Sequence, residues 1–257
     1  MKPSKVLAKL RSGRPAICVK SNLMDSRVID IMGIVGFDCT WLCNEHVPTD
    51  WYTIENQIRA SKMHDMDCIV RVSKGSYSDY VRPLEADATG IMVPHVFTAD
   101  EARNIVRMTK FMPVGRRPID GGNADGNYCM TPVEEYVKAA NRERFVMIQI
   151  EDPEPMEQLD DICAVEGFEI VFFGPSDFTH GSGLLPQLSH PDVLSARRRI
   201  AESARKHGKW AGTMASVDNI EEIMDEGYQF LAVGADVVAL GNYFRDIRVG
   251  LERKGLI

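Results

Sequence analysis

A single-domain α/β fold, the (β/α)8 or TIM barrel, is predicted for residues 1–257 by three features of the sequence. The length of 257 residues is typical of a barrel of alternating strands and helices. Eight short runs of apolar, β-branched and aromatic residues recur along the chain, as expected of parallel strands buried on both faces. Stretches with helical periodicity separate these runs, and no Pro/Gly/Ser-rich linker divides the chain.

The eight predicted strands follow local turn and breaker signals. A Ser12–Pro15 turn precedes the first strand, Gly36 introduces the second, and Pro94 stops the fourth. Nearly every connection leaves room for a crossover helix, which favours a closed parallel barrel. The runs are Ala16–Val19, Phe37–Leu42, Cys68–Val72, Gly90–Val93, Val146–Ile150, Ile170–Phe173, Trp210–Thr213 and Phe230–Gly234.

The segments between the strands contain helical patterns and one long irregular stretch. Helical periodicity is clear in Ala99–Thr109 and in Pro191–His207. The irregular stretch, Gly115–Tyr128, is rich in glycine but lacks the Gly-Lys-Ser/Thr ending of a phosphate-binding P-loop. A loop of this length is usually functional or part of an interface.

Composition excludes several classes of partner. The net charge of -7 and the pI near 5.4 argue against binding to nucleic acid. No apolar run is long enough for a membrane helix, and the start at Met1–Lys5 leads into a polar helix rather than a signal region. The six cysteines lack zinc-binding spacing, so we expect reduced thiols and a cytoplasmic protein.

Two carboxylates stand where buried strands end. Glu151 closes the fifth strand, and Asp177 follows the sixth strand through a Gly-Pro-Ser turn. The carboxyl ends of barrel strands carry the chemistry of such enzymes, and paired carboxylates suit Mg²⁺ or Mn²⁺. The alternative is structural, with one acid capping a helix and the other pairing with an arginine.

Three further polar residues are expected at the same rim. Arg71 lies inside the third strand, where it must pair with a buried acid or face the mouth and bind a carboxylate. His46 follows Glu45 at the end of the second strand and is a candidate proton shuttle, although a lone histidine is more often structural. Gln149 shares a face with Glu151 and could orient a ligand. Together these residues suit proton abstraction from a metal-bound 2-oxo acid.

Several short motifs follow one another along nearly the whole chain. They are Gly36-Phe37-Asp38, Glu45-His46-x-Pro48, Val93-Pro94, Gln149-Ile150-Glu151, Phe173-Gly174-Pro175-Ser176-Asp177 and Val233-Gly234-Ala235-Asp236. This ordered set resembles the HpcH/HpaI family of class II, metal-dependent pyruvate aldolases. The family includes 2,4-dihydroxyhept-2-ene-1,7-dioate aldolases and 2-dehydro-3-deoxyglucarate aldolases.

The resemblance implies reversible cleavage of a 4-hydroxy-2-oxo acid to pyruvate and an aldehyde through a metal-bound enolate. It implies Mg²⁺, Mn²⁺ or Co²⁺ on Glu151 and Asp177, and Arg71 on the pyruvate carboxylate. It makes His46 the base and implies that backbone amides around Gly174, Pro175 and Ser176 hold the substrate. It also implies a homo-oligomer, a trimer or a hexamer that exchanges the last helix between copies.

The sequence departs from the family pattern at three positions near the expected site. Cys43 stands where the family usually has an aspartate, and it does not carry the same charge. Glu85 stands where an aspartate often pairs with the catalytic histidine, and it is expected to serve with His46. Lys20 stands where relatives often have tryptophan, which suggests a mouth that accepts anions.

Three functions therefore remain open from the sequence. An aldolase is favoured over a decarboxylase or acyl-CoA lyase that uses the same enolate chemistry. A basic groove for the phosphates of CoA is not evident in this acidic chain. A non-catalytic homologue that binds a 2-oxo acid is disfavoured, because Glu151, Asp177 and Arg71 are all present.

Overall fold

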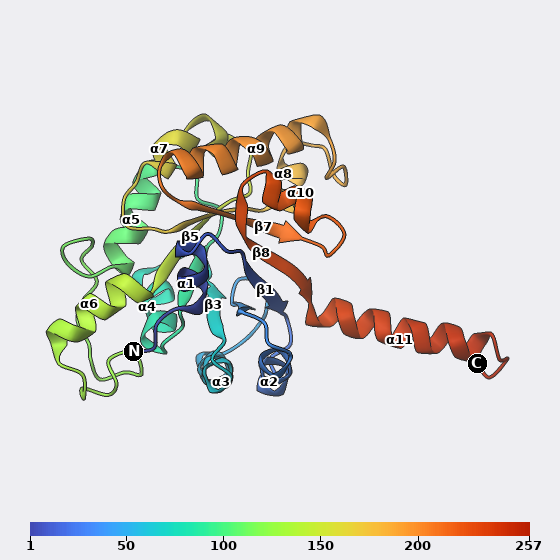
Figure 1. Ribbon diagram of the computed structural model, residues 1–257, viewed down its shortest axis with the longest axis horizontal. Coiled ribbons are helices and arrows are strands. Elements are labelled where there is room, and N and C mark those ends of the chain that lie inside the picture. Colours follow the sequence, from blue (N-terminus) through green and yellow to red (C-terminus); the bar gives the residue numbers. More distant parts are fainter.

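The computed structural model describes residues 1–257 and confirms the predicted barrel. Eight parallel strands close on themselves in sequence order (Figure 1). Each strand boundary lies within two residues of the prediction. The strands are β1 (Ala16–Ser21), β2 (Cys39–Cys43), β3 (Asp67–Arg71), β4 (Gly90–Val93), β5 (Phe145–Ile150), β6 (Ile170–Phe173), β7 (Trp210–Ala215) and β8 (Tyr228–Ala235).

Helices connect the strands and cover the outside of the barrel. The predicted helix Ala99–Thr109 has the predicted bounds, and the helix that begins at Pro191 ends at Lys206. The helices are α1 (Lys5–Arg11), α2 (Ser26–Val35), α3 (Trp51–Met63), α4 (Tyr77–Glu85), α5 (Ala99–Thr109), α6 (Val133–Glu143), the 3-10 helix η1 (Glu154–Glu157), α7 (Leu159–Cys163), α8 (Pro175–Gly181), α9 (Pro191–Lys206), α10 (Ile220–Asp225) and α11 (Asp236–Glu252). The long irregular stretch lies between α5 and α6, which follow β4 without an intervening strand.

Alternation along the strands decides which side chains enter the barrel. The interior is filled by a cluster that includes Cys18, Trp41, Ile69, Met147 and Phe172. The Phe172 ring packs edge to face on the Trp41 ring with centroids 5.6 Å apart. Since successive side chains alternate between the faces of a strand, the next inward positions carry polar residues at the mouth. These residues are Lys20, Cys43, Arg71 and Gln149.

The amino ends of the strands are closed by a polar network. Asp67, the first residue of β3, accepts hydrogen bonds from the Ser4 hydroxyl at 2.7 Å and the Val6 amide at 2.8 Å. Arg144 donates to Asp87 over 2.5 Å, and all these side chains are buried. Burial of charged groups is tolerated here because each has found a partner within the chain.

Helix α11 extends away from the barrel and ends at the C-terminus (Figure 1). Apolar side chains are exposed along it, and they include Val238, Leu240, Tyr243, Phe244 and Ile247. Its first residue, Asp236, is buried and accepts hydrogen bonds from the Ser21 hydroxyl and the Asn22 and Leu23 amides. None of the helices combines the length and the apolarity needed to cross a membrane.

Candidate functional site

Arg71 is the central cation of the mouth. It ends β3 and is 4% exposed, because its side chain points inward above Ile69. Its Nε lies 2.8 Å from Glu45 Oε2, and its terminal nitrogen lies 3.2 Å from Cys43 Sγ. Its guanidinium carbon also stands 5.0 Å from the centroid of the Trp41 ring. The prediction that Arg71 faces the mouth and the prediction that it pairs with an acid are therefore both met.

The Cys43 thiol is more acidic than an ordinary thiol. Burial by itself would raise its pKa, but the charge of Arg71 and the hydrogen bond from it lower the pKa below the usual value. The His46 amide lies 3.5 Å from the sulfur and acts in the same direction. The cysteine that replaces the family's aspartate can therefore carry negative charge more readily than its residue type suggests.

Glu151 is a carboxylate held almost completely out of water. It is 1% exposed, accepts a hydrogen bond from the His95 amide at 3.0 Å, and accepts another from the Gln149 side-chain amide. Burial raises its pKa from 4.5 to about 7. The backbone of Gly174 passes so close that an added Cβ would lie 2.6 Å from the Glu151 Cβ, so only glycine fits at position 174.

His95 is a site residue that the sequence analysis missed. It follows Pro94 at the end of β4 and has a left-handed backbone with φ of 50°. Its Nδ1 lies 2.8 Å from Asp152 Oδ2, while its Nε2 lies 3.6 Å from Glu151 and 3.7 Å from Glu45. Burial would lower the pKa of His95, but the Asp152 hydrogen bond and the nearby carboxylates raise it. The available signal was a histidine directly after a strand end.

Asp177 and its neighbours form the first turn of α8, which begins directly after β6. The Asp177 side chain is exposed and Gly174 is buried. Of the three predicted backbone donors, Pro175 has no N–H and the Gly174 amide already donates to the Ile150 carbonyl at 2.9 Å. This part of the prediction is corrected, because only the Ser176 amide remains free to hold a substrate oxygen.

The mouth fits a cation that needs few protein ligands. No three His, Cys, Asp or Glu side chains converge as a closed metal site. Mg²⁺ and its relatives, however, bind through one or two carboxylates and take waters and substrate oxygens for the rest. Glu151 is a buried oxygen ligand whose ionised form lacks sufficient positive charge, and the buried Gln149 Oε1 beside it has no hydrogen-bond partner. The donor set is therefore compatible with a hard divalent cation.

His46 and Glu85 do not meet within one chain. His46 is 60% exposed, and its Nε2 lies 3.6 Å from Glu45. Glu85 ends α4 on the outside of the barrel, where it lines a hollow with Trp51, Arg82 and Tyr128. The segment before a strand lies away from the carboxyl ends that form the mouth, so the fold itself separates the two residues.

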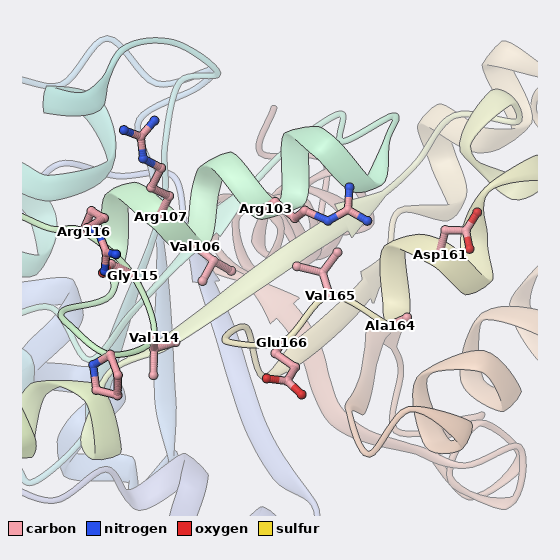
Figure 2. Close-up of a pocket in the computed structure, with 11 residues that line it drawn as sticks. Arg103, Val106, Arg107, Val114, Gly115, Arg116, Asp161, Ala164, Val165 and Glu166 are labelled. Carbon is pink, nitrogen blue, oxygen red and sulfur yellow. The ribbon is translucent and has the colours of Figure 1, made fainter.

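A surface cavity of about 590 Å³ lies outside the barrel and contains none of the predicted site residues. Figure 2 shows Arg103 and Arg107 extending from α5 on one side, with Val165 and Glu166 after α7 on the other. Acidic side chains accompany the arginines, since Asp161 and Glu166 line the same cavity. The functional site is therefore assigned to the barrel mouth.

Comparisons with known proteins agree over most of the chain. The sequence profile of the HpcH/HpaI aldolase/citrate lyase family matches residues 19–242. The chain is 32% identical over 229 residues to a hydroxypyruvate/pyruvate aldolase from Roseobacter denitrificans, with 88% of each chain covered. It is 31% identical to a 5-keto-4-deoxy-D-glucarate aldolase from Klebsiella pneumoniae, with 91% of each covered.

The fold comparison gives the same result. The crystal structure of an HpcH/HpaI aldolase from Desulfitobacterium hafniense superposes on this chain with a TM-score of 0.91. The two sequences are 27% identical, and the match covers 96% of each chain.

Proposed function

The chain belongs to the HpcH/HpaI aldolase/citrate lyase family, and from this premise we propose that it cleaves a 4-hydroxy-2-oxo acid reversibly to pyruvate and an aldehyde. The chain is a carbon–carbon lyase of the aldolase type, as its family and its relatives establish. The observation that supports the proposed reaction best is the placement of Arg71 and Glu151 together at the mouth, linked by Glu45 and His95.

We assign the divalent metal, Mg²⁺, Mn²⁺ or Co²⁺, to Glu151 and Asp177. When bound, the cation would polarise the keto group of the substrate and stabilise the negative charge of the enolate. Burial makes Glu151 hold a proton up to a pH of about 7, so a cation that replaces this proton would relieve an unfavourable ionisation. Gln149 holds the Glu151 carboxylate in position through its side-chain amide.

Arg71 would bind the pyruvate carboxylate. Its guanidinium is planar and permanently charged, which suits a carboxylate held by two nitrogens. In the structure Glu45 is its partner, so a bound substrate would share Arg71 with Glu45 or displace it. The free Ser176 amide would supply a further hydrogen bond to the substrate.

His46 would move the proton of the aldehyde hydroxyl. Its imidazole is exposed beside the mouth and contacts only Glu45 among the acids of this chain. Glu85 can assist His46 only if a neighbouring copy presents it, because α4 holds it on the outside of the same barrel. His95, fixed by Asp152, balances the charges of Glu45 and Glu151.

We also propose a homo-oligomer, a trimer or a hexamer, in which α11 packs on another copy. An apolar hollow of about 530 Å³ lies between α2 and the start of α11, and α11 itself exposes a row of apolar side chains. Light scattering of the full chain and of a chain ending at Ala235 would test this: a monomeric full chain contradicts it. A cytoplasmic location is proposed on the six free thiols.

Proton exchange of pyruvate tests the reaction without any knowledge of the aldehyde. Chelator-treated protein is incubated with pyruvate in deuterated water, and the methyl protons are followed by NMR with and without Mn²⁺. Metal-dependent loss of the methyl signal is expected. Absence of exchange in the metal-loaded protein, together with loss of CO₂ from oxaloacetate, would contradict the aldolase and favour a decarboxylase.

A further inference from the structure

We propose that Lys20 recognises a carboxylate on the substrate fragment that leaves as the aldehyde, and that it thereby selects acidic acceptors. This inference rests on the proposed aldol cleavage. It concerns a residue outside the metal and pyruvate half of the site.

Lys20 points into the mouth and is only half-buried. It lies on β1 two residues beyond Cys18, which fills the barrel interior, so its side chain enters from the same face. Its Nζ lies 5.1 Å from the centroid of the Trp41 ring, and the Arg71 guanidinium stands 5.0 Å from the same centroid. The two cations are therefore no farther apart than about twice that distance.

The ammonium of Lys20 has no hydrogen bond and no ion pair within the chain. The nearby acids are already engaged, since Glu45 faces Arg71 and Asp236 accepts from Ser21, Asn22 and Leu23. A partly buried cation beside a second cation is unfavourable unless an anion joins it. Burial first and Arg71 second lower the pKa of Lys20, which agrees with a local lack of negative charge.

The order of strands places Lys20 across the mouth from Glu151. In a closed barrel of eight strands, β1 lies opposite β5, where Glu151 follows the strand end. A 2-oxo acid whose reacting end is held by Arg71 and the Glu151 side has only the remaining width of the mouth for its far end. That far end reaches β1, where the ammonium of Lys20 can pair with a terminal carboxylate.

The test compares two four-carbon acceptors that differ by one carboxylate, 4-oxobutanoate and butanal. The ratio of kcat/KM for their addition to pyruvate is measured in wild-type protein and in Lys20→Met. We expect the ratio to fall by about tenfold or more, as for loss of a charge-assisted hydrogen bond. Lys20→Arg should recover most of the ratio, because it restores the charge.

The control variant is Lys209→Met at the other end of the barrel. Lys209 is also half-buried over an aromatic ring, 4.3 Å from the Phe168 centroid, and burial also lowers its pKa. Its substitution should leave the ratio unchanged. A ratio unaffected by Lys20→Met, or an equal loss with both acceptors, overturns the proposal.

A binding measurement separates this proposal from the aldol reaction itself. Calorimetric titration of the metal-loaded protein with succinate and with butyrate requires no turnover. Tighter binding of succinate that disappears in Lys20→Met supports the anion site even if pyruvate exchange fails. Equal affinity of the two acids in wild-type protein contradicts it. Thermal unfolding of each variant identifies any loss of fold.

Discussion

The two ends of the barrel bury similar polar residues for different purposes. At the amino end, Asp67 is satisfied by Ser4 and Val6, and the other charges of the network also find partners within the chain. At the carboxyl end, Lys20 has no partner and Glu151 holds a proton up to a pH of about 7. Complete pairing marks a structural closure, whereas incomplete pairing marks a place where a ligand completes the set.

The strongest way to break this contrast is Glu151→Gln. The amide keeps the shape but removes the metal-binding charge, so turnover should fall by at least about a hundredfold. The fold should survive with unchanged or higher stability, because an unfavourable buried carboxylate is lost. Steady-state kinetics and thermal unfolding measure the two effects. Full activity of this variant in the presence of chelator would show that the metal site is wrongly assigned.

Arg71→Lys tests the carboxylate site with a smaller effect. Lysine keeps the charge but loses the planar pair of donors, so we expect KM for pyruvate in the exchange reaction to rise by about tenfold. The same substitution also weakens the contacts with Glu45 and Cys43. An unchanged KM would exclude Arg71 from pyruvate binding.

At the amino end, Asp67→Ala should affect stability and leave catalysis intact. The Ser4 hydroxyl and the Val6 amide would lose their acceptor, at a cost of about 1–3 kcal/mol in the free energy of unfolding. Denaturant unfolding measures the change, and Asp67→Asn should lose less because it keeps one acceptor oxygen. A selective loss of kcat would mean that the two ends of the barrel are coupled.

The smallest expected effect is a pH-dependent stabilisation by Mg²⁺. The pKa of Glu151 in the folded protein is raised to about 7, so its contribution to stability is full at low pH and is lost as pH rises through 7. A cation favours the ionised form, so Mg²⁺ should raise the unfolding midpoint more at pH 8 than at pH 6, by about 2–4 °C. The difference should vanish in Glu151→Gln; its persistence there would place the cation elsewhere.

The fold was predictable because strands buried on both faces leave long apolar runs in the sequence. Each of the eight runs became a strand, and the turn signals at Gly36 and Pro94 marked real boundaries. The roles of Glu151, Asp177 and Arg71 remain predictions, although the structure brings Arg71 and Glu151 to one rim. Barrel topology carries this information, since all strand ends meet at the same mouth.

The missed features depend on contacts that sequence order does not reveal. His95 joins Asp152, Glu45 and Glu151 through a single left-handed residue, and no local pattern specifies that turn. Glu85 was expected beside His46, but alignment with a family cannot show on which side of a helix or in which copy a residue acts. The acidity of Cys43 likewise follows from its distance to Arg71.

Asp236 gives the departing helix a thermodynamic consequence. The residue begins α11 and also binds the segment that directly follows Lys20, and β8 passes into the helix without a linker. Any force that a second copy exerts on α11 is therefore transmitted to the loop beside the acceptor end of the mouth. Self-association and the choice of aldehyde share one coupling free energy, so each must shift the other by the same factor in affinity.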